Sequence, residues 1–150
     1  MPKIQNPKLA IKHIKEKSLA ECTVTCQIFF FPDELEFMKN NPLTKYNLKC
    51  RLLGDDSGPG KGGDDVLWVF NKVLSYPDKT PTQIENAEFS ALLGDDQLDE
   101  DGVYRPQDEI YGKLTLAHRM FPQPVSAKTN IVKIYAWWVA SFWQTTHSLP

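Results

Sequence analysis

Long apolar runs are missing from this sequence. The longest, residues 28–31 and 136–140, are far too short to cross a bilayer, which takes about 20 apolar residues in a helix. A signal peptide is also missing, because no apolar stretch follows the charged start at Lys3. We therefore expect a cytoplasmic protein with no membrane span, and export by another route is left open.

Cysteine is scarce: the chain has three, Cys22, Cys26 and Cys50. Cys22 and Cys26 are four apart in an alternating segment, so in a strand they lie roughly 13 Å apart and cannot bond each other. Cys26 could face Cys50 on a neighbouring strand, but an odd number of thiols fits a reducing compartment better. We interpret all three as small core residues.

Catalytic signatures are absent as well. The three histidines, His13, His118 and His147, have no His or Cys at a zinc-ligand spacing, and there is no G-x-S-x-G elbow. A cysteine could meet His118 in space as nucleophile and base, but core-like strands keep thiols inert. We expect His118, beside Arg119, to be a surface residue. The sequence therefore favours a protein that is not an enzyme.

Strong charge of one sign is lacking too. The net charge is −2, which argues against a general affinity for nucleic acid or anionic lipid. The charges are unevenly spread: residues 1–17 hold five lysines and one acid, whereas residues 54–65 and 85–109 hold four and nine of the 19 acids. We expect a basic N-terminal segment over residues 1–20 and acidic loops, including one over residues 94–109.

Alternation of apolar and polar residues is the strongest pattern present, and it predicts strands. The clearest case is ECTVTCQIFFF, which places Cys22, Val24, Cys26, Ile28 and Phe30 on one face. TKYNLKCRLL predicts a second strand with Tyr46, Leu48, Cys50 and Leu52 inward, and EIYGKLTLAH a third. VLWVFNKVLSY has no polar face near its start, so we expect a strand that is buried on both faces.

Other segments are less regular. Residues 1–20 suit an edge strand guarded by lysines. FPDELEFMKNNP suits a short helix that starts at Pro32 and ends at Asn41. Residues 83–93 could be either helix or strand; the capping-box spacing of Thr82 and Glu85 favours helix. RMFPQPVSAKTN looks like a proline-containing connection, and IVKIYAWWVASFW like the final strand.

Together these elements predict one mainly β domain over residues 1–150, with a loose tail at 144–150. No long helices alternate with the strands, so an antiparallel β-sandwich with short helices is expected. An immunoglobulin-like arrangement is one version, although the Cys–Trp–Cys spacing of antibody domains is absent. An α+β domain and a small barrel are the alternatives.

The pentapeptide LLGDD occurs twice, at residues 52–56 and 92–96. The two copies could mark a duplicated unit with equivalent acidic corners. Coincidence is the preferred interpretation, since Leu, Gly and Asp are common at strand ends and turns. If residues 83–93 are a helix, the copies cannot be structurally equivalent.

The acidic loops invite comparison with Ca²⁺ sites, which gather six to eight oxygens. Residues 97–108 approach the EF-hand pattern, but Gln97 replaces the first Asp and Asp108 replaces the bidentate Glu, so we reject an EF-hand. A weak Ca²⁺ site stays open, with these candidates: Asp95, Asp96, Asp99, Asp101 and Asp108. GDDSGPGKGGDD is not a phosphate loop, because Asp55 and Gly62 stand at two required positions.

The last predicted strand has two apolar faces. Val132, Ile134, Ala136, Trp138, Ala140 and Phe142 form the entirely apolar one, which should face the core. The outward face includes Lys133, Tyr135, Trp137, Val139 and Trp143. A row of wet aromatic side chains is unfavourable, so something must cover it.

Three covers are open for this outward aromatic face: the chain's own loops, a protein partner or second copy, and a sugar ring. Interfaces are enriched in Tyr and Trp. We therefore predict a binding or structural module that docks a protein partner or forms a homo-oligomer. A carbohydrate-binding module is the alternative.

Overall fold

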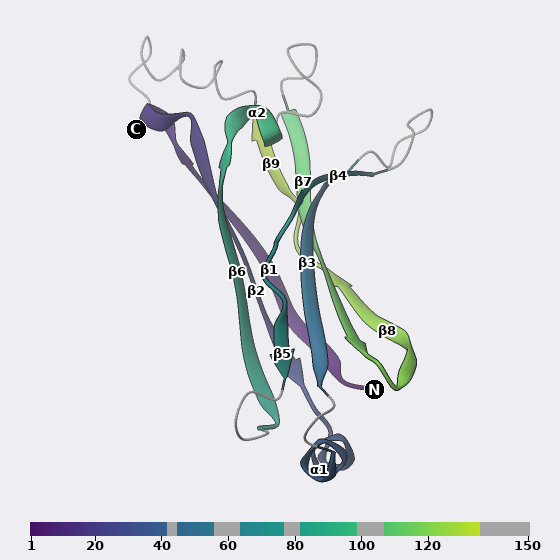
Figure 1. Ribbon diagram of the computed structural model, residues 1–150. Helices are drawn as coiled ribbons and strands as arrows, with labels where there is room; N and C mark the ends of the chain where they lie inside the picture. Colours follow the sequence, from purple (N-terminus) through teal and green to yellow (C-terminus); the bar gives the residue numbers. More distant parts are fainter. Residues whose placement is uncertain (42–44, 56–63, 77–81, 99–106, 136–150) are drawn as a thin grey trace.

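The computed structural model describes residues 1–41, 45–55, 64–76, 82–98 and 107–135, which fold into two antiparallel sheets (Figure 1). Sheet A has the order β1 (Lys3–Ile14), β2 (Leu19–Phe29), β6 (Ile84–Gly94). A 3-10 turn, η1 (Lys15–Lys17), joins the first two strands. The predicted mainly β, two-sheet sandwich is confirmed, and within these ranges neither sheet closes into a barrel.

Sheet B is built around two long central strands, β3 (Tyr46–Gly54) and β7 (Gln107–His118). The free side of β3 carries two short strands, β4 (Asp65–Val69) and β5 (Leu74–Tyr76). The free side of β7 carries β8 (Phe121–Lys128) and β9 (Val132–Tyr135). Sheet B is therefore flanked on both sides by a strand that is broken in the middle.

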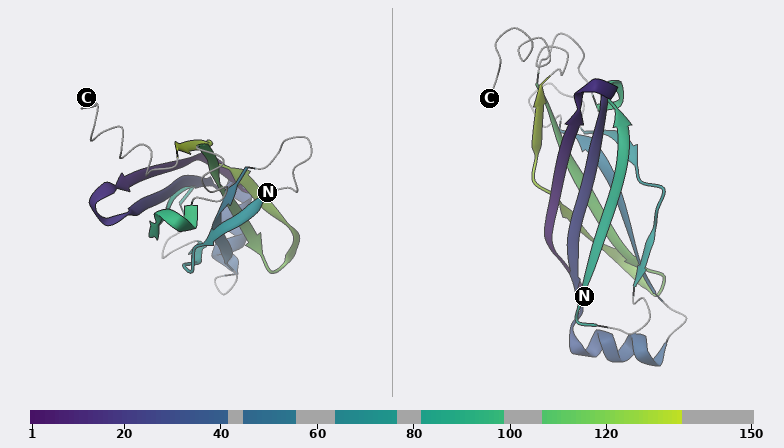
Figure 2. Two further views of the ribbon diagram at one scale, coloured as in Figure 1. Left: turned by 90° about the horizontal axis from the view of Figure 1, so that it is seen from above. Right: turned by 90° about the vertical axis from the view of Figure 1, so that its left-hand side faces the viewer.

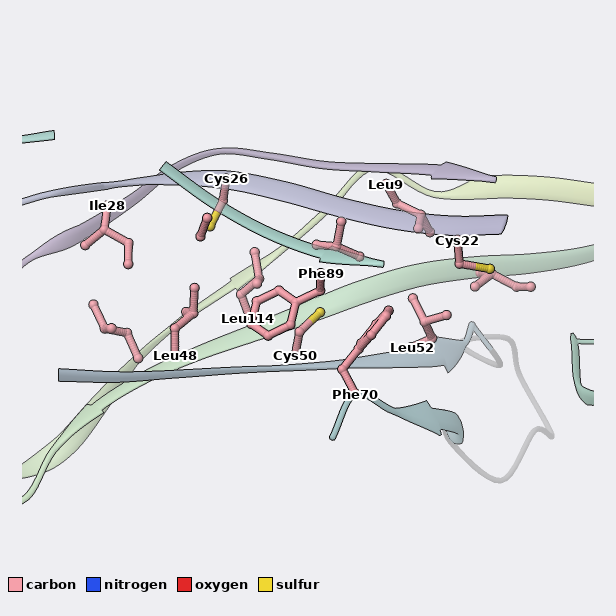
Figure 3. Packing of buried hydrophobic residues seen from close by; sticks show 14 of the residues in the cluster. Leu9, Cys22, Cys26, Ile28, Leu48, Cys50, Leu52, Phe70, Phe89 and Leu114 are labelled. Atoms are coloured by element: carbon pink, nitrogen blue, oxygen red, sulfur yellow. The ribbon is translucent and has the colours of Figure 1, made fainter. Parts of the chain in front are cut away.

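The core lies between the two sheets (Figure 3). The strand alternation sends every second side chain of β2 and β3 inward, and all the residues predicted to face inward there are buried. Figure 3 shows Cys22, Cys26 and Ile28 facing Leu48, Cys50 and Leu52 across the core. Cys26 and Cys50 thus come from opposite sheets, not from neighbouring strands. All three thiols are free and buried, as the core interpretation expects.

The described helices are short. Helix α1 (Pro32–Asn40), the short helix predicted after Phe31, joins β2 to β3 and crosses one end of the sandwich (Figures 1 and 2). Proline occupies its first turn, and Glu34 accepts a 2.9 Å hydrogen bond from the Phe31 N–H. Helix α2 (Asp95–Leu98) follows β6 and buries Leu98. No helix in the described ranges is long and apolar enough to cross a membrane.

The two edges of sheet A differ. On the β1 edge, the side chain of Asn130 accepts a hydrogen bond from the Leu9 N–H (2.8 Å) and donates one to the Leu9 C=O (3.1 Å). Asn130 lies between β8 and β9, so it ties sheet A to sheet B. The opposite edge, β6, pairs with no strand in the described part of the chain beyond β2.

Several predictions of local structure are wrong. Residues 84–94 are a strand, not a helix, because they pair with β2 along their whole length. The segment expected as one strand buried on both faces contains two short strands, and β4 is open on one face, since Val66 and Val69 are 47% and 57% exposed. The connection expected over residues 119–130 contains β8, an edge strand that tolerates its prolines. The acidic loop expected at 94–109 contains α2 and the start of β7.

The two LLGDD copies end strands, β3 and β6. In each copy the first aspartate donates its N–H to a neighbouring strand or turn: Asp55 to Glu109 O at 2.8 Å and Asp95 to Ser18 O at 3.1 Å. Residues 84–94 are a strand, so the argument that a helix there would make the two copies structurally different does not apply. Nevertheless the strands belong to different sheets, and only the second copy continues into a described helix, so duplication stays a hypothesis.

Candidate functional site

The predicted outward aromatic face is described only at its start. In β9, Ile134 is buried and Val132 half-buried, as expected for the core face, while Lys133 points outward and is exposed. The Tyr135 backbone ends β9 opposite Gln107, but its side chain, Trp137, Val139 and Trp143 lie outside the described residues. Docking through this face stays a prediction.

The predicted Ca²⁺ ligands are also only partly described. Asp95 and Asp96 open α2, and the Asp95 carboxylate lies 3.0 Å from Nε2 of His13. Asp99, Asp101 and the side chain of Asp108 lie outside the described residues. Within the described ranges no three His, Cys, Asp or Glu side chains gather as a metal site would require. Ca²⁺ binding stays a prediction.

The thiols are poorly placed for chemistry. Burial raises the pKa of Cys22 and of Cys26 to about 11, and burial together with the nearby Cys26 raises the pKa of Cys50 to about 12. Thiols with such pKa values stay protonated at neutral pH and are poor nucleophiles. His118 lies opposite Tyr46 in the sheet, and Cys50 is four residues further along β3, roughly 13 Å away. No cysteine–histidine pair forms there.

The prediction that His118 is a surface residue is wrong: it is 3% exposed. Its ring packs against those of Tyr46 and Phe121, with centroids 4.7 and 5.0 Å away. Nδ1 accepts a hydrogen bond from the Met120 N–H, and the buried Nε2 has no protein partner in the described structure. Burial, followed by the charge of Arg119, lowers the pKa of His118, so the ring is neutral at pH 7.

β6 is the edge strand of sheet A opposite β1 (Figure 2). The N–H and C=O of one residue in an antiparallel strand point to the same side. Gln83 O accepts from the Phe30 N–H on the β2 side, and Asn86 O accepts from the Tyr76 hydroxyl on the other side. Residues 88, 90 and 92 therefore direct their backbone groups toward the free edge.

A cleft of about 240 Å³ lies beside this edge. Its walls come from β6 and from the chain around the end of β4, and the lining residues are Trp68, Phe70, Asn71, Lys72, Phe89, Ser90 and Ala91. The rings of Phe70 and Phe89 lie 5.6 Å apart, and the buried Nε1 of Trp68 has no protein partner among the described residues. Open backbone and an aromatic cleft thus lie side by side. This edge could not be predicted from the sequence while residues 83–93 were expected to form a helix.

A second, more polar hollow of about 550 Å³ lies on the outer face of sheet A. Amide side chains from its three strands form a chain of hydrogen bonds across it: Asn6 donates to Gln27 at 3.0 Å, and Gln27 donates to Asn86 at 3.2 Å. Asn6 has a positive φ of 52°, at an irregularity in the pairing of β1 with β2. Lys8, Thr25 and Glu88 also line the hollow.

Comparison with known proteins gives no family. No family model matches the chain, and no curated protein matches it. Among solved structures, a Northeast Structural Genomics Consortium target aligns with a TM-score of 0.36 at 11% identity, over 90% of this chain and 84% of that one. A Bordetella pertussis protein assigned provisionally as ApaA aligns with a TM-score of 0.34 at 7% identity, over 90% and 91%. Likeness at this level carries no inference about fold or function.

Proposed function

We propose that this protein is a non-catalytic binding module that docks an extended segment of a partner protein along β6. The observation that carries the proposal is the eleven-residue edge strand, paired on one side only in the described structure. An extended peptide can add a strand to such an edge, gaining main-chain hydrogen bonds. β6 is a better edge for strand addition than β1, because Asn130 already bonds the backbone of Leu9 on β1 and because β1 carries several lysines.

The cleft beside β6 indicates what the partner segment would carry. In an added strand, alternate side chains point toward the core side, where Trp68, Phe70 and Phe89 line the cleft. One large apolar side chain fits there. The Trp68 N–H is a buried donor that a polar atom of the partner could satisfy. The partner motif is thus an extended segment with a large apolar residue among alternating positions.

Ser90→Pro tests the docking edge without breaking sheet A. Proline removes an N–H that faces the free edge, where edge strands tolerate it. Peptides selected from a random displayed library against the wild-type protein should bind Ser90→Pro roughly tenfold more weakly. Ser90→Ala is the matched control, since it removes the hydroxyl but keeps the N–H.

Hydrogen exchange supplies the second readout. Binding should slow exchange at the amides of residues 88, 90 and 92, whereas the odd-numbered amides already bonded to β2 should change little. A concentration-dependent dimer that Ser90→Pro abolishes would make a second copy the partner. Binding that Ser90→Pro leaves intact, with no new protection at these amides, would refute the proposal.

The second candidate is a carbohydrate-binding module, which the polar hollow on sheet A favours. Amides held by one another present fixed donors and acceptors, as sugar hydroxyls require, and about 550 Å³ is within the usual range for ligand pockets. A glycan array should separate the sites: loss of binding in Gln27→Ala would locate the sugar in this hollow. Loss in Trp137→Ala would locate it on the outward aromatic face.

We also propose that the protein works in the cytoplasm and without catalysis. Three free, buried thiols with raised pKa values support a reducing compartment and an inert core. Fractionation of cells that express the full chain would test the location.

A further inference from the structure

The outer face of sheet B carries an unusual row of cations. Arg51 on β3 is the register partner of Lys113 on β7, and Lys113 is the partner of Lys128 on β8. We call these three residues the basic row. Directly opposite residues have Cβ atoms about 4.5–5.5 Å apart, and like charges in such pairs destabilise a sheet. An arrangement with this cost calls for a compensating negative charge.

No ion pair of the described structure includes a residue of the basic row. The ion pairs of Met1 with Glu34 and of His13 with Asp95 lie elsewhere. The next outward pair on β3 and β7 is Lys49 with Thr115, which adds a fourth cation. The acids Asp55 and Asp64 lie at the Gly54 end of the face, where Asp64 accepts a 2.6 Å hydrogen bond from the Tyr111 hydroxyl, and no acid of the described structure lines the hollow beside the row.

Lys128 has a different neighbour from the rest of the row. Its ammonium lies 5.1 Å from the centroid of the Tyr111 ring, in a cation–π contact. Arg51, Lys113 and Lys49 are left to face a hollow of about 270 Å³, whose wall also includes Val69 and Thr115. The positive charge is therefore concentrated at one small depression on the sheet.

We propose that this hollow binds a phosphate or sulfate group. The guanidinium of Arg51 can donate two parallel hydrogen bonds to an oxyanion, and the lysine ammonium groups and the Thr115 hydroxyl can donate to its remaining oxygens. Pockets for drug-sized ligands usually measure about 300–1,000 Å³, so a hollow of about 270 Å³ suits a small charged group. Val69, 57% exposed, gives the carbon side of an ester an apolar wall. The site is separate from β6 and does not depend on the proposed function.

Titration with sodium phosphate and with sodium sulfate, followed by ¹⁵N NMR, tests the site. Sodium chloride at equal ionic strength is the reference. We expect saturating shifts at the amides of residues 50, 51, 113 and 115 with the oxyanions only. Phenyl phosphate should bind more tightly than inorganic phosphate if the natural group is an ester beside Val69. Equal affinity would indicate a free ion. Shifts that grow linearly in every salt would overturn the proposal.

Matched double variants locate the binding. Arg51→Gln/Lys113→Gln should weaken phosphate binding by about tenfold or more, because it removes two of the three facing cations. Lys12→Gln/Lys17→Gln makes the same change in net charge on exposed residues of sheet A and its turn, and should stay within about twofold of wild type. Equal losses in both variants would show a non-specific charge effect and overturn the proposal.

Thermal melting separates a binding role from a structural one. In chloride, Arg51→Gln/Lys113→Gln should melt at or above the wild-type temperature, because it relieves repulsion along the row. Phosphate should raise the wild-type melting temperature and leave that of the variant unchanged. A variant that is less stable in chloride would show that these side chains support the fold, which would contradict an anion site.

Discussion

Replacement of Asn130 by alanine should lower the free energy of unfolding, because Asn130 ties the β1 edge of sheet A to sheet B. The Asn130 side chain makes two hydrogen bonds to the Leu9 backbone, at 2.8 and 3.1 Å, both partly buried. Each such bond contributes about 1 kcal/mol net, so the variant should lose about 2 kcal/mol of unfolding free energy. For a chain of this length that corresponds to a drop of roughly 4–8 °C in melting temperature.

Urea unfolding of wild type, Asn130→Ala and Asn47→Ala measures the effect. Asn47 accepts a 2.9 Å hydrogen bond from the Ser75 hydroxyl, but this pair is exposed, so its loss should cost less than about 0.5 kcal/mol. Asn130→Asp should be no more stable than Asn130→Ala, because a carboxylate cannot donate a hydrogen bond to the Leu9 C=O. If the unfolding free energy of Asn130→Ala were within about 0.5 kcal/mol of that of wild type, the two hydrogen bonds between Asn130 and Leu9 would not hold the two sheets together.

Three further outcomes are expected. The lowered pKa of His118 means that the unfolded chain takes up a proton first as pH falls below about 6.5, so unfolding free energy should decrease with falling pH there. His118→Phe should flatten that slope in urea unfolding measured from pH 7 to 5. Gly112→Ala should cost about 1–3 kcal/mol in the same assay, because a Cβ would lie 3.1 Å from Thr129 and 3.2 Å from Val24. Finally, the buried thiols should react with a disulfide reagent only as fast as the protein unfolds. The rate can be measured by quenching the labelling reaction at intervals and determining the mass of the protein. Labelling of the native protein within minutes would contradict the burial of the thiols.

Much of the fold could be predicted from the sequence where alternation was regular. β2, β3 and β7 each place apolar residues at every second position, which is the signal of a half-buried strand. The helix at Pro32 was equally clear, because proline, two acids and a following Asn–Pro mark both of its ends. Local chemistry is sufficient in these segments, because tertiary contacts agree with it.

The error at residues 83–93 shows how a correct local signal can mislead. Thr82 does bond Glu85, with its hydroxyl 2.7 Å from the carboxylate, as the capping-box spacing suggested. The contact closes a turn before a strand, however, and pairing with β2 over eleven positions overrides it. For His118 there was no signal to use, because its cover comes from residues such as Phe37 and Tyr46, far away in sequence.

The candidate sites were largely beyond prediction from sequence. The free edge of β6 depends on which strands pair, and the basic row depends on register: Arg51, Lys113 and Lys128 become neighbours only when three distant segments align. Individually each is an ordinary surface residue.

The order of pairing in sheet A also has a consequence for the growing chain. β1 and β2 form a hairpin through residues 15–18, but β6 ends 65 residues after β2, at residue 94 against residue 29. At 5–20 residues per second, synthesis of that interval takes roughly 3–13 s. During this time β2 has a free edge, with backbone N–H and C=O groups that β6 will later pair. An edge that is closed in the finished molecule is therefore open to pairing with another chain while the protein is being made.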